Sequence, residues 1–393
     1  MNRNHVKNLR AFLLSTLVIW IATYAAVMRD YSTDYASHNI WAICLTRDNF
    51  FEFTRTYISY PLWHILVNGL HKMFPTDTLS TAASVTALFN CFALWAIMYI
   101  WGKFSNTYVD FTDVSFWSVC LLFVGPLSLP VFSPYYYLGQ GSGNVWHNPT
   151  NIAVKGFAVV CFFLIVHILE STKTEKELKR EYVILSVLLV LSVLAKPSFF
   201  QGIVPGLGLY FVFVLVTKGW KLYIKRFLLI AMCFVPAMTI IAFQFVAAFL
   251  NGTSGGIGVG IEFGRVLHEW TPNLGISLAL AFSFPLAMLI MNGKTLIRKT
   301  PIQVVLFYEF AAWLESAFLY ERGPREGHGN WLWGSFVSMF IVWIVFLIYY
   351  IDIINDDSIS AEKKKLNILV GMPLLFLHLL FGIGHWYSYS MFS

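Results

Sequence analysis

Long apolar segments recur along the whole sequence, separated by short polar ones. Hydropathy predicts eleven membrane spans, at 11–28, 82–101, 114–132, 151–169, 183–195, 199–217, 227–250, 275–291, 302–320, 332–352 and 366–386. Inside a bilayer the backbone finds no water and must satisfy its own hydrogen bonds, which helices do within one segment. We therefore predict an all-α polytopic membrane protein with about 11 transmembrane helices.

Composition excludes a water-soluble fold for a chain of 393 residues. Hydrophobic residues make up 58% and charged residues 12%, against about 25% charged residues in soluble domains. We expect residues 1–393 to form one integral membrane domain. The five cysteines form no CxxC pair and are interpreted as small buried side chains, which predicts neither a disulfide nor a metal site.

The segment 57–74 decides the topology, because its apolar core is short and contains Pro61, His64 and Lys72. If it lies at the outer interface, 18 of the 27 basic residues fall on the cytoplasmic side, in agreement with the positive-inside rule. We therefore predict a cytoplasmic N-terminus, an external C-terminus and a long first external loop at 29–81 with interfacial helices. The 18 residues are Arg3, Lys7, Arg10, Lys103, Lys173, Lys176, Lys179, Arg180, Lys218, Lys221, Lys225, Arg226, Lys294, Arg298, Lys299, Lys363, Lys364 and Lys365.

The first external loop carries the candidate catalytic residues Asp30, Asp34 and His38. Asp34 and His38 are four residues apart and share a face of a short helix predicted over 35–46. An ionised carboxylate beside a membrane cavity can act as a general base toward a hydroxyl group. The alternatives are a capping role for Asp34, a solvated loop position for Asp30 and a structural role for His38.

Further external loops are predicted at 133–150, 251–274 and 321–331, and with the neighbouring turns they hold the candidate substrate-binding residues. Arginine binds phosphate with a bidentate fork, and aromatic rings at the interface suit a ligand with a lipid tail. Lysine snorkelling, arginine pairing with Glu321 and Glu326, and a simple aromatic belt are the structural alternatives. The candidates are Arg322, Arg325, Lys196, His147, Lys155, His328 and Tyr136.

Other motifs carry little information. The glycine-rich SGGIGVG at 254–260 is predicted to lie outside, without the strand and helix that a nucleotide loop requires. No zinc-ligand spacing occurs, so no metal site or cofactor is predicted and a divalent ion is not indicated. The sequence also predicts no soluble basic face, which argues against nucleic acid as a partner.

Taken together, the pattern resembles the GT-C superfamily of membrane glycosyltransferases. The resemblance rests on an acidic motif soon after the first span, a long first external loop and basic polar loops later on the same side. It implies a sugar transfer from a polyprenyl-phosphate donor to a glycan or lipid-linked acceptor, with membrane lipid around it. It also implies that Asp34, and after it Asp30, is the general base. The spacing D-x3-D-x3-H departs from the compact acidic pairs of the family.

We expect the protein to lie in the bacterial plasma membrane with its active site facing outward. Its reaction is expected to belong to the biosynthesis of a cell-envelope polysaccharide. A polysaccharide polymerase or ligase is a second hypothesis, which the short late loops disfavour. A transporter or flippase of lipid-linked glycans is a third, although no internal repeat is apparent. A membrane acyltransferase using His147 or His328 is a weaker fourth.

Overall fold

The structure is a computed structural model that describes residues 3–29, 34–74, 76–131, 141–219, 223–246, 258–324 and 326–392. Two short strands, β1 (Gly258–Ile261) and β2 (Leu319–Arg322), form an antiparallel sheet that the sequence analysis did not predict. A 3₁₀ turn, η2 (Glu326–His328), follows β2. The helices are α1 (Arg3–Met28), α2 (Asp34–Cys44), α3 (Phe50–Thr56), α4 (Leu62–Met73), α5 (Thr78–Phe104), α6 (Phe111–Leu121), α7 (Pro149–Glu170), α8 (Lys179–Ala195), α9 (Ser198–Lys218), α10 (Ile224–Phe245), α11 (Leu267–Trp270), α12 (Leu274–Leu296), α13 (Thr300–Phe318), α14 (Leu332–Asn355) and α15 (Ala361–Phe392).

Four helices are capped at their starts by short polar side chains. Asp77, Asp110, Asn148 and Asn273 cap α5, α6, α7 and α12, each accepting a hydrogen bond from a backbone N–H of the first turn. Such caps satisfy donors that a helix leaves unpaired at its N-terminus. The starts of these four helices therefore follow from local sequence as well as from hydropathy.

Eight helices of the described part are long and apolar enough to cross a membrane, namely α1, α5, α7, α9, α10, α12, α14 and α15. This agrees with the predicted all-α membrane fold. Helix α6 has 11 residues and α8 has 17, while α13 carries Glu309 and Glu315. Membrane crossing by these three remains a prediction.

The third predicted span, 114–132, is not one continuous helix. Helix α6 ends at Leu121, and Gly125-Pro126 and Pro130 follow, where proline removes the N–H that a helix needs. The segment then runs between α15 and α12: Gly125 N donates to His378 O and Leu127 N to Leu280 O, both at 3.1 Å. A Cβ added at Gly125 would lie 2.8 Å from the Cα of Gly382, so the contact requires glycine.

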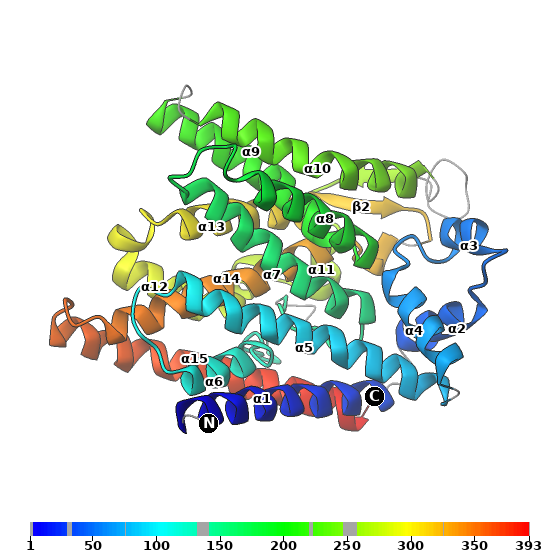
Figure 1. The fold of residues 1–393 in the computed structure, drawn as a ribbon, viewed down its shortest axis with the longest axis horizontal. Helices are drawn as coiled ribbons and strands as arrows, with labels where there is room; N and C mark the ends of the chain where they lie inside the picture. The colour runs from blue at the N-terminus through cyan, green and yellow to red at the C-terminus, as the bar shows by residue number, and fades with distance from the viewer. Residues whose placement is uncertain are drawn as a thin grey trace.

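When the shorter α6, α8 and α13 are counted with the long helices, successive helices run in alternating directions along the bundle, as Figure 1 shows. Helix α1 begins at the end where α9 ends and where the turns 105–110, 171–178, 297–299 and 356–360 lie, here called the basic end. Lys7 at the start of α1 pairs with Asp110 there, at 2.9 Å. Helices α2 to α4 and the β1–β2 sheet occupy the opposite end, here called the loop end (Figure 1). Most of the basic residues predicted as cytoplasmic thus gather at one end.

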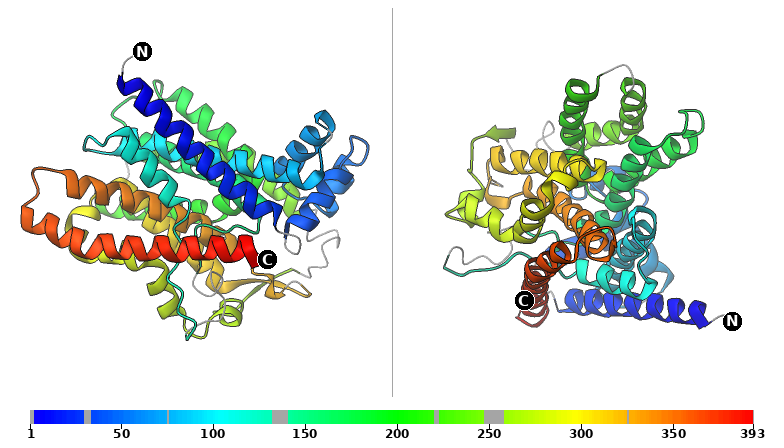
Figure 2. Two further views of the ribbon diagram at one scale, coloured as in Figure 1. Left: turned by 90° about the horizontal axis from the view of Figure 1, so that it is seen from below. Right: turned by 90° about the vertical axis from the view of Figure 1, so that its left-hand side faces the viewer.

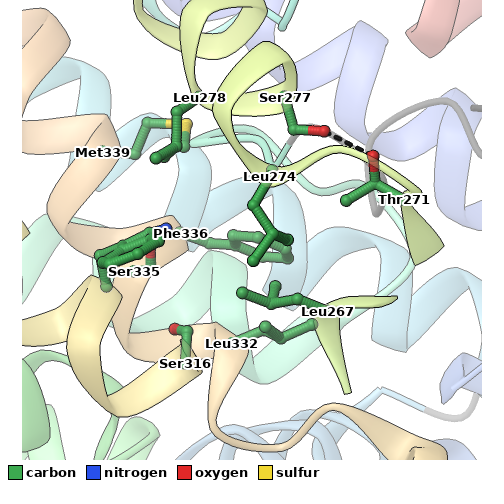
Figure 3. A pocket seen from close by; sticks show the side chains of 12 residues that line it. Leu267, Thr271, Leu274, Ser277, Leu278, Ser316, Leu332, Ser335, Phe336 and Met339 are labelled. Atoms are coloured by element: carbon green, nitrogen blue, oxygen red, sulfur yellow. Dashed lines mark hydrogen bonds between the residues drawn. The ribbon is translucent and has the colours of Figure 1, made fainter. Parts of the chain in front are cut away.

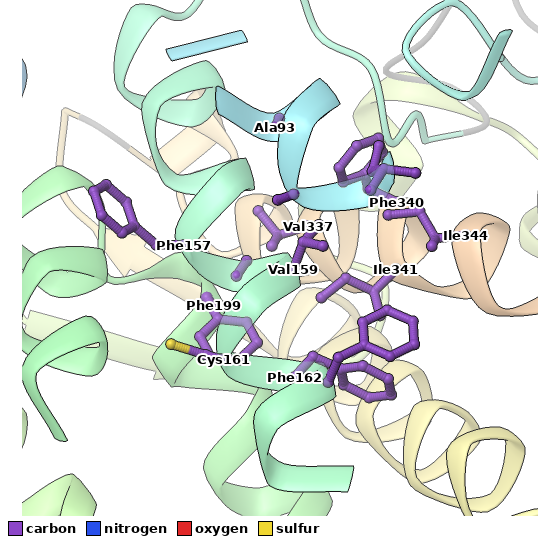
Figure 4. Packing of buried hydrophobic residues seen from close by; sticks show 14 of the residues in the cluster. Ala93, Phe157, Val159, Cys161, Phe162, Phe199, Val337, Phe340, Ile341 and Ile344 are labelled. Atoms are coloured by element: carbon purple, nitrogen blue, oxygen red, sulfur yellow. The ribbon is translucent and has the colours of Figure 1, made fainter. Parts of the chain in front are cut away.

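The core is built around α14, whose most apolar stretch is 94% buried, against 28% for α15. Phe340, Ile341 and Ile344 of α14 pack with Phe162 of α7 and Phe199 of α9, as Figure 4 shows. Helices α1 and α15 lie together along one side of the bundle, and α9 and α10 lie along the opposite side (Figures 1 and 2). The central position of α14 fixes the ends of α7, α9 and α13 relative to one another.

Helices α2, α3 and α4 form the first loop. Helix α2 spans Asp34–Cys44, which confirms the helix predicted over 35–46. Helix α4 has 12 residues, about 18 Å at 1.5 Å per residue, which is too short for a bilayer core of about 30 Å. Asn68 of α4 donates to Ala42 O and Leu45 O at 2.7 and 3.0 Å and so holds α4 against α2. Their location at a membrane interface remains a prediction.

Candidate functional site

The candidate site is a buried polar cluster at the loop end where α2, α7, the α8–α9 junction and α14 meet. Four of the predicted residues, Asp34, His38, His147 and Lys196, lie in it. Asp30, Arg325 and Tyr136 lie outside the described residues. We call the group formed by Asp34, Asn148, Lys196, His147 and Trp333 the Asp34 cluster.

The centre of the cluster is the side-chain amide of Asn148. Its Nδ2 donates to Asp34 Oδ2 at 2.5 Å, and its Oδ1 accepts from Lys196 Nζ at 3.0 Å. The same Oδ1 caps α7 by accepting from Asn151 N at 2.8 Å. One amide therefore joins a carboxylate and an ammonium group that are 162 residues apart in sequence (196 minus 34), and it fixes both relative to the start of α7.

Lys196 lies in the break between α8 and α9, which Pro197 enforces. The side chain is 4% exposed, so it does not snorkel to the surface. Its Nζ lies 3.9 Å from the centre of the Trp333 ring and 5.7 Å from that of Tyr60. The aromatic faces attract the ammonium group and exclude water from one side of it.

Burial controls the ionisation of the cluster. It lowers the pKa of Lys196 from 10.5 to about 7, an effect that the Asp34 charge partly offsets. It likewise lowers the pKa of His147 to about 4, again opposed by Asp34. The His147 ring packs 5.7 Å from that of Trp333 and 6.4 Å from that of Tyr389. Near neutral pH the cluster thus holds a neutral imidazole and a lysine close to half protonation.

His38 lies on the next turn of α2 and contacts His64 of α4. His38 Nδ1 and His64 Nε2 are 2.8 Å apart, and the two side chains are 7% and 0% exposed. Burial, followed by the charges of His64 and Lys196, lowers the pKa of His38 well below 6.5. The sequence predicted that Asp34 and His38 share a face of α2, and the Lys196 charge acts on both.

Lys155 is a second buried lysine that, like Lys196, donates to an asparagine side chain and lies near an aromatic ring. Its Nζ donates to Asn144 Oδ1 at 2.7 Å and lies 4.8 Å from the centre of the Phe340 ring. Asn144 in turn donates to Leu121 O and Val124 O, both at 2.8 Å, which ties the segment before α7 to the end of α6. A substrate-binding role for Lys155 stays a prediction.

Arg322 and His328 also lie at the loop end. Arg322 ends β2 opposite Gly258 and is exposed, and His328 ends η2. Within the described ranges, neither side chain forms a hydrogen bond, ion pair or ring contact with the Asp34 cluster. Glu326, predicted as a partner for the loop arginines, pairs with Arg265 at 2.5 Å.

A separate small cavity lies between α12, α13 and α14 (Figure 3). Its volume is about 30 Å³, and Ser277, Ser316 and Ser335 face it together with apolar side chains. Ser277 and Thr271 share a hydrogen bond of 2.7 Å at its rim. A cavity of this size holds a water molecule or two, not a sugar. Among the described residues, no group of three or more His, Cys, Asp or Glu side chains could hold a metal ion.

Comparison with known proteins identifies the fold. No protein-family model matches the sequence, and no curated protein matches it. The crystal structure of the Archaeoglobus fulgidus oligosaccharyltransferase, tethered to an acceptor peptide with an NVT sequon, is similar with a TM-score of 0.53 and 11% identity. The match covers 96% of this chain. The chain shares the fold of this oligosaccharyltransferase, which is a GT-C glycosyltransferase.

The fold inferred from the sequence is thereby confirmed. The chain spans about half the length of the oligosaccharyltransferase, since the match covers 55% of that protein. At this identity the likeness is one of fold, so the activity has to be argued from the Asp34 cluster. Within the GT-C fold, α2 follows the first long helix and carries Asp34 at its first turn.

Several residues of the site were missed by the sequence analysis. Asn148, Asn144, His64 and Trp333 were not singled out, although each bonds to or packs on a predicted residue. The sequence Asn148-Pro149-Thr150 at the start of an apolar run is a recognisable helix cap and would have marked Asn148. His64 and Trp333 carry no local signal, because their partners come from other helices.

Proposed function

We propose that the protein is a glycosyltransferase that moves a sugar from a polyprenyl-phosphate-linked donor to a glycan or lipid-linked acceptor. The observation that carries the proposal is the single amide of Asn148 bonded to both the Asp34 carboxylate and the Lys196 ammonium. A base and a cation held side by side, at one end of a membrane bundle, fit a reaction in which a hydroxyl loses a proton while a phosphate leaves. The GT-C fold supports the same reaction class.

In the proposed reaction, the carboxylate of Asp34 takes the proton of the acceptor hydroxyl. The hydroxyl oxygen forms a bond to the anomeric carbon of the donor, and the bond from that carbon to the phosphate oxygen breaks. The electron pair leaves with the polyprenyl phosphate, whose growing charge Lys196 stabilises. Lys196 is suited to this role because it is buried and has few competing partners, so its charge is weakly screened.

The remaining predicted residues are proposed to hold the donor. Arg322 and Arg325 would bind phosphate at the mouth of the site, with His147, His328 and Tyr136 around the sugar and lipid. Lys155 is proposed to support the segment before α7 and to contribute positive potential. The reaction needs no cofactor. We place the protein in the bacterial plasma membrane with the loop end outward, acting on a cell-envelope glycan.

The test is a turnover assay on the full-length protein in nanodiscs. Farnesyl-phosphate-linked glucose, galactose, mannose and N-acetylglucosamine are supplied with cell-envelope glycans, and release of farnesyl phosphate is measured. We expect Asp34→Asn to abolish release while the protein remains folded. Asp113→Asn, which removes an exposed carboxylate at the first turn of α6, is the matched control and should retain full turnover.

The outcomes separate the competing functions. Full turnover by Asp34→Asn refutes Asp34 as the base and, if Asp30→Asn also turns over, refutes the mechanism. Movement of the labelled lipid between leaflets without release of farnesyl phosphate would identify a flippase instead. Repeated addition of sugars to a single acceptor would identify a polymerase.

A further inference from the structure

A cavity of about 400 Å³ lies at the loop end, outside the Asp34 cluster. Its walls come from the end of α1, the end of α4 and the start of α5, and five hydroxyl side chains, one carboxylate and two apolar side chains line it. Its volume falls within the range of about 300–1,000 Å³ that small-molecule sites occupy. The cavity between α12, α13 and α14, of about 30 Å³, is far smaller. The larger cavity therefore has room for a ligand.

The protons of three lining hydroxyls are directed into the protein. Tyr24 donates to Ser80 Oγ at 3.2 Å, and Ser80 Oγ in turn donates to Asp77 Oδ2. Ser84 donates to the backbone carbonyl of Ser80 at 2.8 Å. A hydroxyl group has one proton and two lone pairs. Tyr24 and Ser84 are therefore left with lone pairs that can accept hydrogen bonds from a ligand.

Asp77 adds a negative charge to these acceptors. Its Oδ1 accepts from the backbone N–H of Ser80 at 2.8 Å, and the hydrogen bonds from Ser80 lower the pKa of the Asp77 carboxyl. The carboxylate is thus ionised near neutral pH, and both of its oxygens have further lone pairs. Among the described residues that line the cavity there is no lysine, arginine or histidine. The lining disfavours a phosphate and favours a ligand rich in hydrogen-bond donors.

A saccharide unit has the chemistry and the size that this lining requires. Its several hydroxyl groups can donate to separate acceptors, which here come from α1 (Tyr24) and from the start of α5 (Asp77 and Ser84). Leu70 and Phe74, at the end of α4, line the cavity as well and suit the apolar C–H face of a sugar ring. A single ammonium group would satisfy the Asp77 charge but would fill only a small part of the volume.

The helix that carries Asp34 also contacts the elements that form the cavity. Asn39 of α2 donates to Thr78 Oγ1 at the start of α5, at 3.3 Å. Asn68 holds α4 against α2 on the other side. Asp34 lies at the first turn of α2, so the cavity and the Asp34 cluster are attached to the same short helix.

We propose that this cavity binds a saccharide unit whose hydroxyl groups donate to Asp77, Tyr24 and Ser84. It holds a unit of the acceptor other than the one that receives the sugar; this assignment rests on the proposed function, whereas saccharide binding does not. A free glycan and the head group of a glycolipid offer the same chemistry. The two sources are separated by experiment.

The test measures the melting temperature of the full-length protein in nanodiscs. One arm adds maltotriose or triacetylchitotriose to the buffer, and the other adds monoglucosyl diacylglycerol to the nanodisc lipid. We expect a higher melting temperature for the wild type in at least one arm. Asp77→Asn should weaken the binding by about tenfold or more, because the charge is lost and an amide donor replaces one acceptor. Asparagine is an equally good N-cap, so α5 keeps its cap.

Asp110→Asn is the matched control for Asp77→Asn. Asp110 caps α6 at the basic end, so the variant also removes one carboxylate from a helix cap, far from the cavity. Its response to both probes should equal that of the wild type. Ser84→Phe, which fills the cavity, should abolish the response and raise KM for an oligosaccharide acceptor by about tenfold, with a much smaller effect on kcat.

The outcomes are distinct. A response to the soluble saccharides identifies a free glycan as the ligand, and a response to the glycolipid alone identifies a lipid head group; both support the site. No response in either arm, or equal responses of Asp77→Asn and the wild type, would overturn the proposal. So would a response to choline chloride, without one to the saccharides or glycolipid, that Asp77→Asn removes. Asp34→Asn should respond as the wild type does, so a failure of the proposed reaction would be recognised separately.

Discussion

Replacement of Lys196 by methionine should make the protein more stable and less able to bind a prenyl phosphate. Methionine has a similar volume and no charge. At pH 7 the unfolded chain carries a proton on Lys196 that about half of the folded molecules lack, because burial lowers its pKa from 10.5 to about 7. At 1.36 kcal/mol per pKa unit, this costs the folded protein about 4 kcal/mol. Loss of the bond to Asn148 offsets about 1 kcal/mol, so the net gain is about 3 kcal/mol.

The pH dependence identifies the cause. Between pH 7 and 10.5 the unfolded state binds more protons than the folded state, so the stability of the wild type rises with pH in that window. The advantage of Lys196→Met should therefore fall to about zero near pH 10. SDS titration in mixed micelles at pH 7 and pH 10 measures both free energies of unfolding.

Binding is measured on the same preparations with farnesyl phosphate as the probe, by the shift in melting temperature. We expect a shift for the wild type and for Lys103→Met, and none for Lys196→Met. Lys103 is the control because it also lies over an aromatic ring, that of Tyr99 at 5.7 Å, but is exposed. A destabilised Lys196→Met with unchanged farnesyl phosphate binding would refute the reasoning.

The other variants and treatments separate stability from function. Asn148→Ala removes a helix cap and the bridge in the Asp34 cluster, and should lower both turnover and stability, the latter by about 2 kcal/mol in SDS titration. Asp352→Ala at the basic end removes the carboxylate that accepts five hydrogen bonds from Ser105, Asn106 and Thr107. We expect lower stability and an unchanged affinity for farnesyl phosphate. Arg322→Ala should weaken farnesyl phosphate binding by about tenfold without a change in melting temperature. EDTA should leave farnesyl phosphate release unchanged, and restoration of lost activity by Mg²⁺ or Mn²⁺ would show a metal requirement.

The sequence predicted those features that depend on residues close together in the chain. Apolar length predicted the long helices, and the spacing of Asp34 and His38 predicted that they share one face of a helix. Charge distribution predicted which turns gather at one end of the bundle. Each of these depends on neighbours in the chain, so no knowledge of tertiary contacts was needed.

The composition of the Asp34 cluster depends on contacts between distant segments. Lys196 follows an apolar helix and precedes Pro197, a pattern equally compatible with a surface turn, but the Trp333 ring covers it. Asn148 bonds to a residue 114 positions away. His64 was interpreted as one of several polar residues that keep 57–74 out of the membrane, and its contact with His38 became visible only with α2 and α4 packed together.

The segment after α6 has a consequence for biosynthesis. A membrane helix satisfies its backbone as soon as it leaves the ribosome and can enter the lipid at once. The amides of Gly125 and Leu127 instead bond to carbonyls of α15 and α12, which are translated roughly 150 to 250 residues later. Until then, the amides of Gly125 and Leu127 lack these partners in lipid. The packing of this segment in the bilayer therefore waits until α12 and α15 have been synthesised, so it is completed long after α6 has formed.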